Sequence, residues 1–198
     1  MSGTLHPIYG LAIAAIAAGL FPPAATAQSA PVPEGDPTLE ITQFALHVTD
    51  ATGRPSYQLE GTRLREFGRN GPQYIDDPRL DLLDARGLEW RWTAPEALYR
   101  RDRARLELFG PTLGLQPARD DRVRTEIDSR DVQVDTETLV ATSEQRATLR
   151  QPGLLHSGVG LRLDSRADTM VLFSDVYTRY SQSSEEDAAN APATPLAE

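Results

Sequence analysis

Apolar and polar residues alternate with a period of two along most of residues 38–180. The pattern is clear in Phe44, Ala45, Leu46, His47 and Val48. Such runs, bounded by Gly, Pro and Asp, are typical of β-strands with one buried face. Gly53-Arg54-Pro55 and Asp84-Ala85-Arg86-Gly87 fit the turns between them. A short helix at 94–99 is the one alternative, but Pro95 favours a strand and a turn there.

Polar turns recur in the second half of the chain, roughly every 31 to 32 residues. They are Arg101-Asp102-Arg103, Asp135-Thr136-Glu137 and Asp164-Ser165-Arg166-Ala167-Asp168. A recurring strand–turn–strand unit cannot bury its apolar face alone, so successive units must stack. The sequence therefore predicts an all-β jelly roll or β-taco of stacked antiparallel hairpins, with two sheets facing one another around an apolar slot.

The N-terminus predicts export from the cytoplasm. Residues 8–21 carry no charge, and Ala25-Thr26-Ala27 follows as a cleavage site, so residues 1–27 resemble a signal peptide. A retained membrane anchor over the same residues is the alternative, and the segment before the apolar run has no Lys or Arg. We expect a linker at 28–37, one domain at 38–180 and a disordered acidic tail at 181–198.

Composition excludes several kinds of function. The chain has a net charge of −9, and all its basic residues are Arg. An acidic chain is a poor candidate for nucleic-acid binding, because counterion release needs clustered basic side chains. It has no Cys, and His6, His47 and His156 lie far apart, so we expect no metal, no cofactor and no enzyme activity. His156-Ser157-Gly158 lacks the earlier Gly of a nucleophile elbow and is interpreted as a polar turn opening a strand.

Two charged groups have simple structural explanations. Asp76 and Asp77 are neighbours, and adjacent strand residues face opposite ways, so they cannot cooperate as acid and base. The run from Tyr99 to Arg105 has four Arg and is interpreted as a solvated hairpin tip. A contact of these Arg with phosphate or acidic head groups is the alternative.

The apolar faces of the first and last strands indicate a binding function. Phe44, Leu46 and Val48 share one parity, and Met170, Leu172, Val176 and Tyr180 share another. Plain core packing explains any single residue of this set. A long stack of hairpins with two apolar inner faces could also leave a slot for acyl chains.

A series of short motifs, in order along residues 44–180, resembles the LptC family. They are Gly53-x-x-Ser56-Tyr57-x-Leu59, Asp77-Pro78-x-Leu80, Asp84-x-x-Gly87, Trp90-x-x-x-Ala94, Gly158-Val159-Gly160-Leu161-Arg162 and Val176-Tyr177-Thr178-Arg179-Tyr180. The related LptA proteins share the fold but lack this Trp and this closing pattern. The missing basic flank and the cleavage site at the N-terminus depart from the family, whose members usually keep an anchor.

The resemblance implies a non-enzymatic lipopolysaccharide-binding relay on the periplasmic side of the inner membrane. It implies the transporter subunits LptB, LptF and LptG as partners, and LptA as the acceptor of the lipid. Strand parity predicts that Phe44, Leu46, Met170 and Tyr180 face the acyl chains, and the resemblance adds Ile75. An LptA-like periplasmic bridge, or a structural β-protein with a dry core, are the alternatives.

The strand 169–180 is expected to be an open edge that pairs with LptA. It is the last strand of the stack, and it contains no Pro and no Gly to deter pairing. The residues expected along this edge are Thr169, Leu172, Val176 and Thr178.

Overall fold

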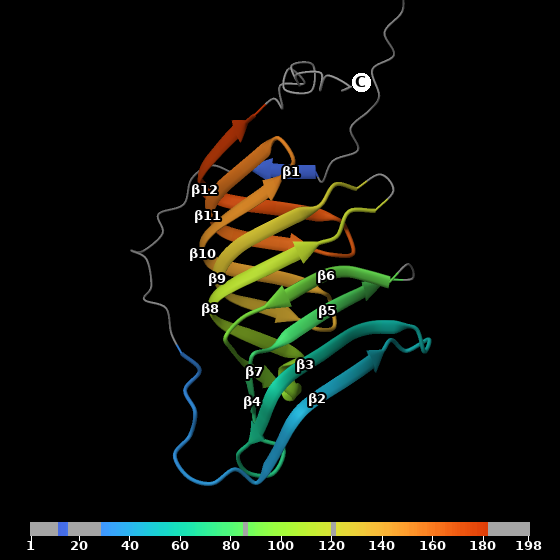
Figure 1. Cartoon of the computed structure of the whole chain (residues 1–198), viewed down its shortest axis with the longest axis vertical. Helices are drawn as coiled ribbons and strands as arrows, with labels where there is room; N and C mark the ends of the chain where they lie inside the picture. Colours follow the sequence, from blue (N-terminus) through green and yellow to red (C-terminus); the bar gives the residue numbers. More distant parts are fainter. Residues whose placement is uncertain (1–11, 16–28, 85–86, 120–121, 182–198) are drawn as a thin grey trace, which may run out of the picture.

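The computed structural model describes residues 12–15, 29–84, 87–119 and 122–181 (Figure 1). They form twelve strands and one 3₁₀ turn, η1 (Arg101–Arg103). The strands are β1 (Ala12–Ala15), β2 (Leu39–Thr49), β3 (Pro55–Glu66), β4 (Gln73–Asp76), β5 (Arg79–Asp84), β6 (Gly87–Thr93), β7 (Glu96–Arg100), β8 (Arg105–Gln116), β9 (Thr125–Asp135), β10 (Val140–Gln151), β11 (Leu154–Asp164) and β12 (Thr169–Tyr180). In these ranges no helix has the length and apolarity needed to cross a bilayer.

All twelve strands belong to one sheet, and every pairing in it is antiparallel except that of β1 with β12. The short strands β4 and β5 are two halves of one bent strand, because β3 pairs with both. In the same way β6 and β7 together face β8. The expected two facing sheets are therefore two leaves of a single folded sheet.

A seam of backbone irregularities runs across the strands and bends the sheet. Residues with positive φ occur at Gln43, Asp77, Gly110, Asp131, Gly160 and Asp175. Pairing registers shift at the same level in β8–β9, β10–β11 and β11–β12. The Gly110 amide donates to the Asp131 carboxylate at 2.8 Å, which joins two of these positions across neighbouring strands. Bulges of this kind bend a strand, and aligned bulges fold the whole sheet.

We call the two halves the turn leaf and the loop leaf. The turn leaf contains β4, β7 and the parts of the long strands that end in the turns at 101–104, 135–139 and 164–168. The loop leaf contains β5, β6 and the opposite parts of the long strands, which end at the loop 50–54 and at residues 117–119 and 122–124. The gap between the free ends of the leaves, away from the seam, is called the mouth.

Successive turns of the turn leaf are joined directly. The Thr136 amide donates to the Ala104 carbonyl at 2.8 Å, and the Ser165 amide donates to the Leu139 carbonyl at 3.2 Å. The repeat predicted from the sequence is thus confirmed as a stack of turns. The hairpin-tip interpretation is also confirmed, since Arg101, Asp102 and Arg103 are exposed at the turn between β7 and β8.

The core lies between the two leaves. It is one continuous cluster of buried side chains contributed by every strand from β3 to β12. Trp90 and Trp92 stack with their ring centroids 5.9 Å apart, and both are fully buried. A Cβ on Gly114 of β8 would lie 2.7 Å from the Trp92 ring, so only Gly lets the two strands pack there.

Some sequence predictions are corrected by the structure. Strand β7, and not a helix, occupies most of residues 94–99, so the favoured interpretation is confirmed there. His156-Ser157-Gly158 lies inside β11, so the prediction of a turn there was wrong; the turn comes earlier, at 152–153. Of residues 1–27 only β1 is described, and residues 182–198 of the expected tail lie outside the described residues.

Candidate functional site

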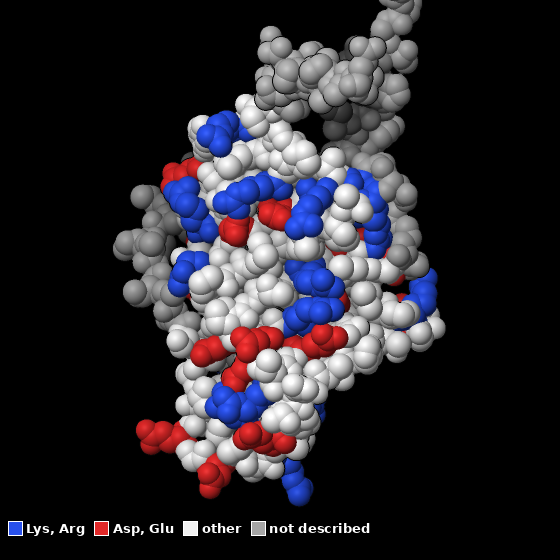
Figure 2. Space-filling view, viewed as in Figure 1, with Lys and Arg blue, Asp and Glu red and all other residues white. Residues whose placement is uncertain are grey.

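The candidate site is the slot, defined as the interior between the turn leaf and the loop leaf. Its inner surface is apolar along all ten strands from β3 to β12, whereas the outer surface carries interspersed Arg and acidic side chains (Figure 2). Outer charges pair across strands: Asp76 with Arg63 and Arg65, and Asp81 with Arg91 at 2.8 Å. This segregation leaves the slot as the one large apolar surface of the described residues.

The structure places Phe44, Leu46 and Ile75 together at the β2 end of the slot. A Cβ on Gly61 would lie within 2.8 Å of both the Phe44 ring and the Ile75 side chain, so these two pack over the same glycine. Leu46 is the cross-strand partner of buried Leu59, which puts it on the inner face, yet it is 39% exposed. Ile75 is buried and Phe44 is half-buried.

Met170 and Tyr180 lie at the other end of the slot, on β12. Met170 pairs with Leu163 and is fully buried. Tyr180 pairs with Leu154 and is 77% exposed. The five predicted lipid-facing residues therefore fall into two groups, one at each end of the slot, and nothing brings the two groups into contact.

The middle of the slot was missed by the sequence analysis. It is built from buried side chains of the central strands, namely Leu80, Trp90, Trp92, Leu106, Leu108, Ile127, Val132 and Leu149. Period-two alternation in β6, β8, β9 and β10 was the available signal. The bulges at the seam reverse the parity within a strand, which hides that signal unless their positions are known.

The prediction that β12 is an open edge throughout was wrong for its first third. Residues 169–172 pair with β1, so Thr169 and Leu172 have a strand on each side. Residues 173–180, which include Val176 and Thr178, pair only with β11 in the part of the chain that the structure describes. Exposed Val176, Tyr177 and Tyr180 lie on this free part of the edge.

Polar contacts cross the mouth and hold the leaves together. The hydroxyls of Tyr57 on the loop leaf and Tyr99 on the turn leaf are hydrogen-bonded at 3.1 Å. Burial and this bond raise the pKa of Tyr57, so it remains protonated and neutral. Arg122 on the loop leaf forms an ion pair at 3.5 Å with Asp168 on the turn leaf.

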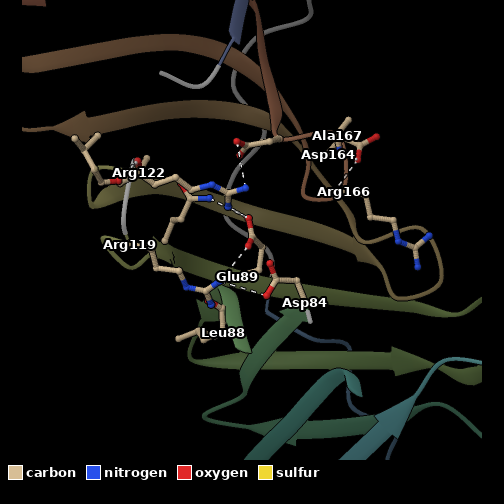
Figure 3. Close-up of polar contacts among 12 residues, drawn as sticks. Asp84, Leu88, Glu89, Arg119, Arg122, Asp164, Arg166 and Ala167 are labelled. Atoms are coloured by element: carbon tan, nitrogen blue, oxygen red, sulfur yellow. Dashed lines mark hydrogen bonds and ion pairs between the residues drawn. The ribbon is translucent and has the colours of Figure 1, made fainter. Parts of the chain in front are cut away.

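A charged cluster on the loop leaf adjoins this ion pair (Figure 3). Arg119 and Arg122, which bridge backbone to backbone, converge on the buried carboxylate of Glu89. Arg119 also contacts Asp84 at 3.3 Å. The described residues contain no group of three or more His, Cys, Asp or Glu arranged to hold a metal ion.

His156 is the one buried imidazole among the described residues, and it lies on the inner face. Its Nδ1 is hydrogen-bonded to the Thr178 hydroxyl at 2.8 Å, which links β11 to the free part of β12. Burial lowers the pKa of His156, because the charged form loses hydration there.

A single antiparallel sheet folded over a continuous apolar interior defines the class of bent β-jelly-roll proteins. The chain belongs to the LptC family, since the family model described as "Lipopolysaccharide-assembly, LptC-related" matches residues 10–181. It is similar in fold to LptH from Pseudomonas aeruginosa, the LptA-homologous periplasmic component of a lipopolysaccharide transport device. The TM-score is 0.52 at 10% identity, over 64% of this chain and 95% of LptH. No curated protein matches it in sequence.

Proposed function

We propose that this protein is a non-enzymatic relay for lipopolysaccharide on the periplasmic side of the inner membrane. It takes acyl chains into the slot, receives the lipid from the ABC transporter formed by LptB, LptF and LptG, and passes it to LptA. Membership of the LptC family supports this role. Residues 1–27 act as a signal peptide or as an anchor that keeps the domain at the membrane.

The observation that carries the proposal is an apolar inner face that is continuous across the sheet and becomes accessible at its two ends. Leu46 at the β2 end and Tyr180 at the β12 end share this face with the buried middle. A lipid chain has no polar group to satisfy there, so burial of its apolar surface supplies the affinity. This protein contributes affinity and geometry, and ATP hydrolysis in the transporter supplies the energy for lipid movement.

The free part of β12 is the proposed docking site for LptA. Its backbone N–H and C=O groups offer a template for one more strand, and continuation of the sheet would continue the slot into the acceptor. Residues 173–180 pair only with β11 among the described residues, so they offer this template whether or not β1 stays beside residues 169–172.

Site-specific photo-cross-linking tests the slot. We expect photoreactive residues at Phe44, Leu46, Ile75, Met170 and Tyr180 to capture lipopolysaccharide in cells that export it. Ala45 and Arg179, exposed residues of opposite parity on the same two strands, serve as matched controls and should remain unlabelled. Equal labelling of both sets would refute the slot as the lipid site.

An LptA-like bridge is the second candidate, favoured by the similarity in fold to LptH. The two candidates differ in co-purification: a relay at the inner membrane is expected to co-purify with the transporter subunits LptB, LptF and LptG, and an LptA-like bridge is not. A dry structural β-protein would give no cross-link at any of the five positions.

A further inference from the structure

A cavity of about 310 Å³ opens at the mouth, between the loops of the loop leaf and the stacked turns of the turn leaf. Its size is at the small end of the roughly 300–1,000 Å³ range of small-molecule sites. Leu82 and Leu139 line it and also belong to the core cluster, so the cavity borders the slot directly. The rest of the lining is Asp50, Arg54, Pro55, Ser56, Leu83, Asp84, Glu89, Arg122, Ser165 and Arg166.

Two buried oxygen atoms of this lining have no hydrogen-bond partner among the described residues. The Ser165 hydroxyl comes from a residue only 7% exposed, and the Glu89 Oε2 atom from one only 5% exposed. Nearly all buried polar groups in proteins are hydrogen-bonded, so two exceptions in one cavity call for an explanation. They approach the cavity from opposite leaves, Ser165 from the turn leaf and Glu89 from the loop leaf.

Glu89 is held in place by its other carboxylate oxygen. Oε1 accepts hydrogen bonds from Arg122 and, at 3.3 Å, from the amide of Gln116, while Arg119 approaches Oε2 only to 3.9 Å. One oxygen is thus committed to the protein and the other is free to accept a hydrogen bond from a ligand. Ser165 is fixed by its own backbone amide, which donates to Leu139.

The charges of the lining balance. Three carboxylates, Asp50, Asp84 and Glu89, stand beside three guanidinium groups, Arg54, Arg122 and Arg166. The Thr52 hydroxyl and the Arg54 amide lower the pKa of Asp50 to about 2, so it is charged at neutral pH. A phosphate would meet three carboxylates as well as three guanidinium groups here, so the cavity offers it no net positive charge. A neutral ligand with several hydroxyl groups meets both donors and acceptors, and its C–H groups meet Pro55 and the leucines.

We propose that this cavity binds a sugar ring of the lipid's head group. One hydroxyl of the ring donates a hydrogen bond to Glu89 Oε2, and another is hydrogen-bonded to the Ser165 hydroxyl. The attached acyl chains pass Leu82 and Leu139 into the slot. This inference rests on the proposed function, since it assigns a recognition element to the same lipid. It gives the relay a preference for glycolipids over phospholipids with the same acyl chains.

Binding measurements with two lipids test the inference. The probes are detergent-solubilised lipid A from which both phosphates have been removed, which leaves a neutral acylated glucosamine disaccharide, and phosphatidylglycerol of matched chain length. Each displaces a fluorescent fatty acid from the full chain. We expect the wild type to prefer lipid A. Ser165→Ala, which removes no intramolecular bond, should weaken lipid A binding about three- to tenfold and leave phosphatidylglycerol binding unchanged. Glu89→Gln should act in the same direction.

Ser157→Ala on β11 and Glu126→Gln on β9 are the matched controls, since neither residue lines the cavity. Free glucosamine disaccharide at high concentration should compete with lipid A in the wild type and not in Ser165→Ala. The inference is overturned if the wild type binds both lipids equally, or if Ser165→Ala weakens both equally. If neither lipid displaces the probe, the proposed function itself fails.

Discussion

The middle of the slot and its two ends share one apolar face but differ in how that face is closed. In the middle, the stacked indoles of Trp90 and Trp92 fill the space between the leaves as a protein core does. At the ends, Leu46 on β2 and Tyr180 on β12 lie on the same face and reach solvent. The terminal strands have a neighbour on one side only over most of their length, so they cannot be covered as the central strands are.

This difference indicates how lipid enters. A packed middle has no room for an acyl chain until the leaves move apart, and the polar contacts across the mouth resist that movement. The ends need no such movement, because their apolar residues are already accessible. Under the proposed function, the exposed residues of the terminal strands are where acyl chains would contact the inner face without prior movement of the leaves. Four experiments test whether the middle and the ends of the slot differ in this way.

The largest effect is expected in the middle. Trp92→Ala should lower the free energy of unfolding by about 3–5 kcal/mol, because a large cavity is left beside Gly114. Denaturant unfolding followed by circular dichroism measures the change. Tyr177→Ala, at an exposed position of the β12 end, should change it by less than about 0.5 kcal/mol. Similar losses in both variants would show that the ends are packed as tightly as the middle.

A smaller effect is expected at the β12 end, on docking. Val176→Pro fixes φ and removes a backbone donor on the free part of the edge, so affinity for LptA should fall about tenfold or more. Deletion of residues 181–198 should leave the affinity unchanged. A variant that keeps its circular dichroism spectrum and binds LptA as the wild type does would refute the edge assignment.

The contact across the mouth should contribute less. Asp168→Asn removes the ion pair with Arg122, and a partly exposed pair of this kind contributes about 1 kcal/mol or less to stability. The same variant should load lipid faster, because the leaves separate more easily. Stopped-flow displacement of a fluorescent fatty acid gives the rate. Arg124→Gln, which breaks the Arg124–Glu126 pair within one leaf, is the control and should load at the wild-type rate.

The smallest effect concerns His156. Its pKa is lowered by burial, so the unfolded chain binds the proton more readily than the folded one. The stability that results is present above pH 6.5 and is lost as the pH falls through the lowered folded-state value. Unfolding curves at several pH values should show this loss in the wild type, and His156→Gln should flatten it. An unchanged slope in the variant would assign the pH dependence to another group.

The strands and turns could be predicted because their signal is local. Alternation around Phe44 and the recurring turns near Asp102, Thr136 and Arg166 needed no knowledge of distant residues. The seam could not be predicted, because its positive-φ positions at Gln43 and Asp175 are not glycines and leave no mark in the alternation.

The mouth was missed for a different reason. Glu89 lies on β6, Arg122 in the segment after β8 and Asp168 in the turn before β12, each more than thirty residues from the next in the sequence. Only the fold brings them together, and no short pattern marks any one of them. The pairing of β1 with β12 is equally non-local, so the end strand could be recognised from the sequence but not which part of its edge is covered.

The order of the sheet has a consequence for the length of the slot. From β2 to β12 each strand pairs with strands close to it in the chain, and each added pair of strands brings one more turn into the stack. Such an architecture is modular, as in linear repeat proteins, where units contact only their neighbours. Duplication of a two-strand unit such as 125–151 would lengthen the groove by a fixed increment without redesign of either terminus. Under the proposed function, the length of apolar surface offered to acyl chains would thus grow in steps of one hairpin.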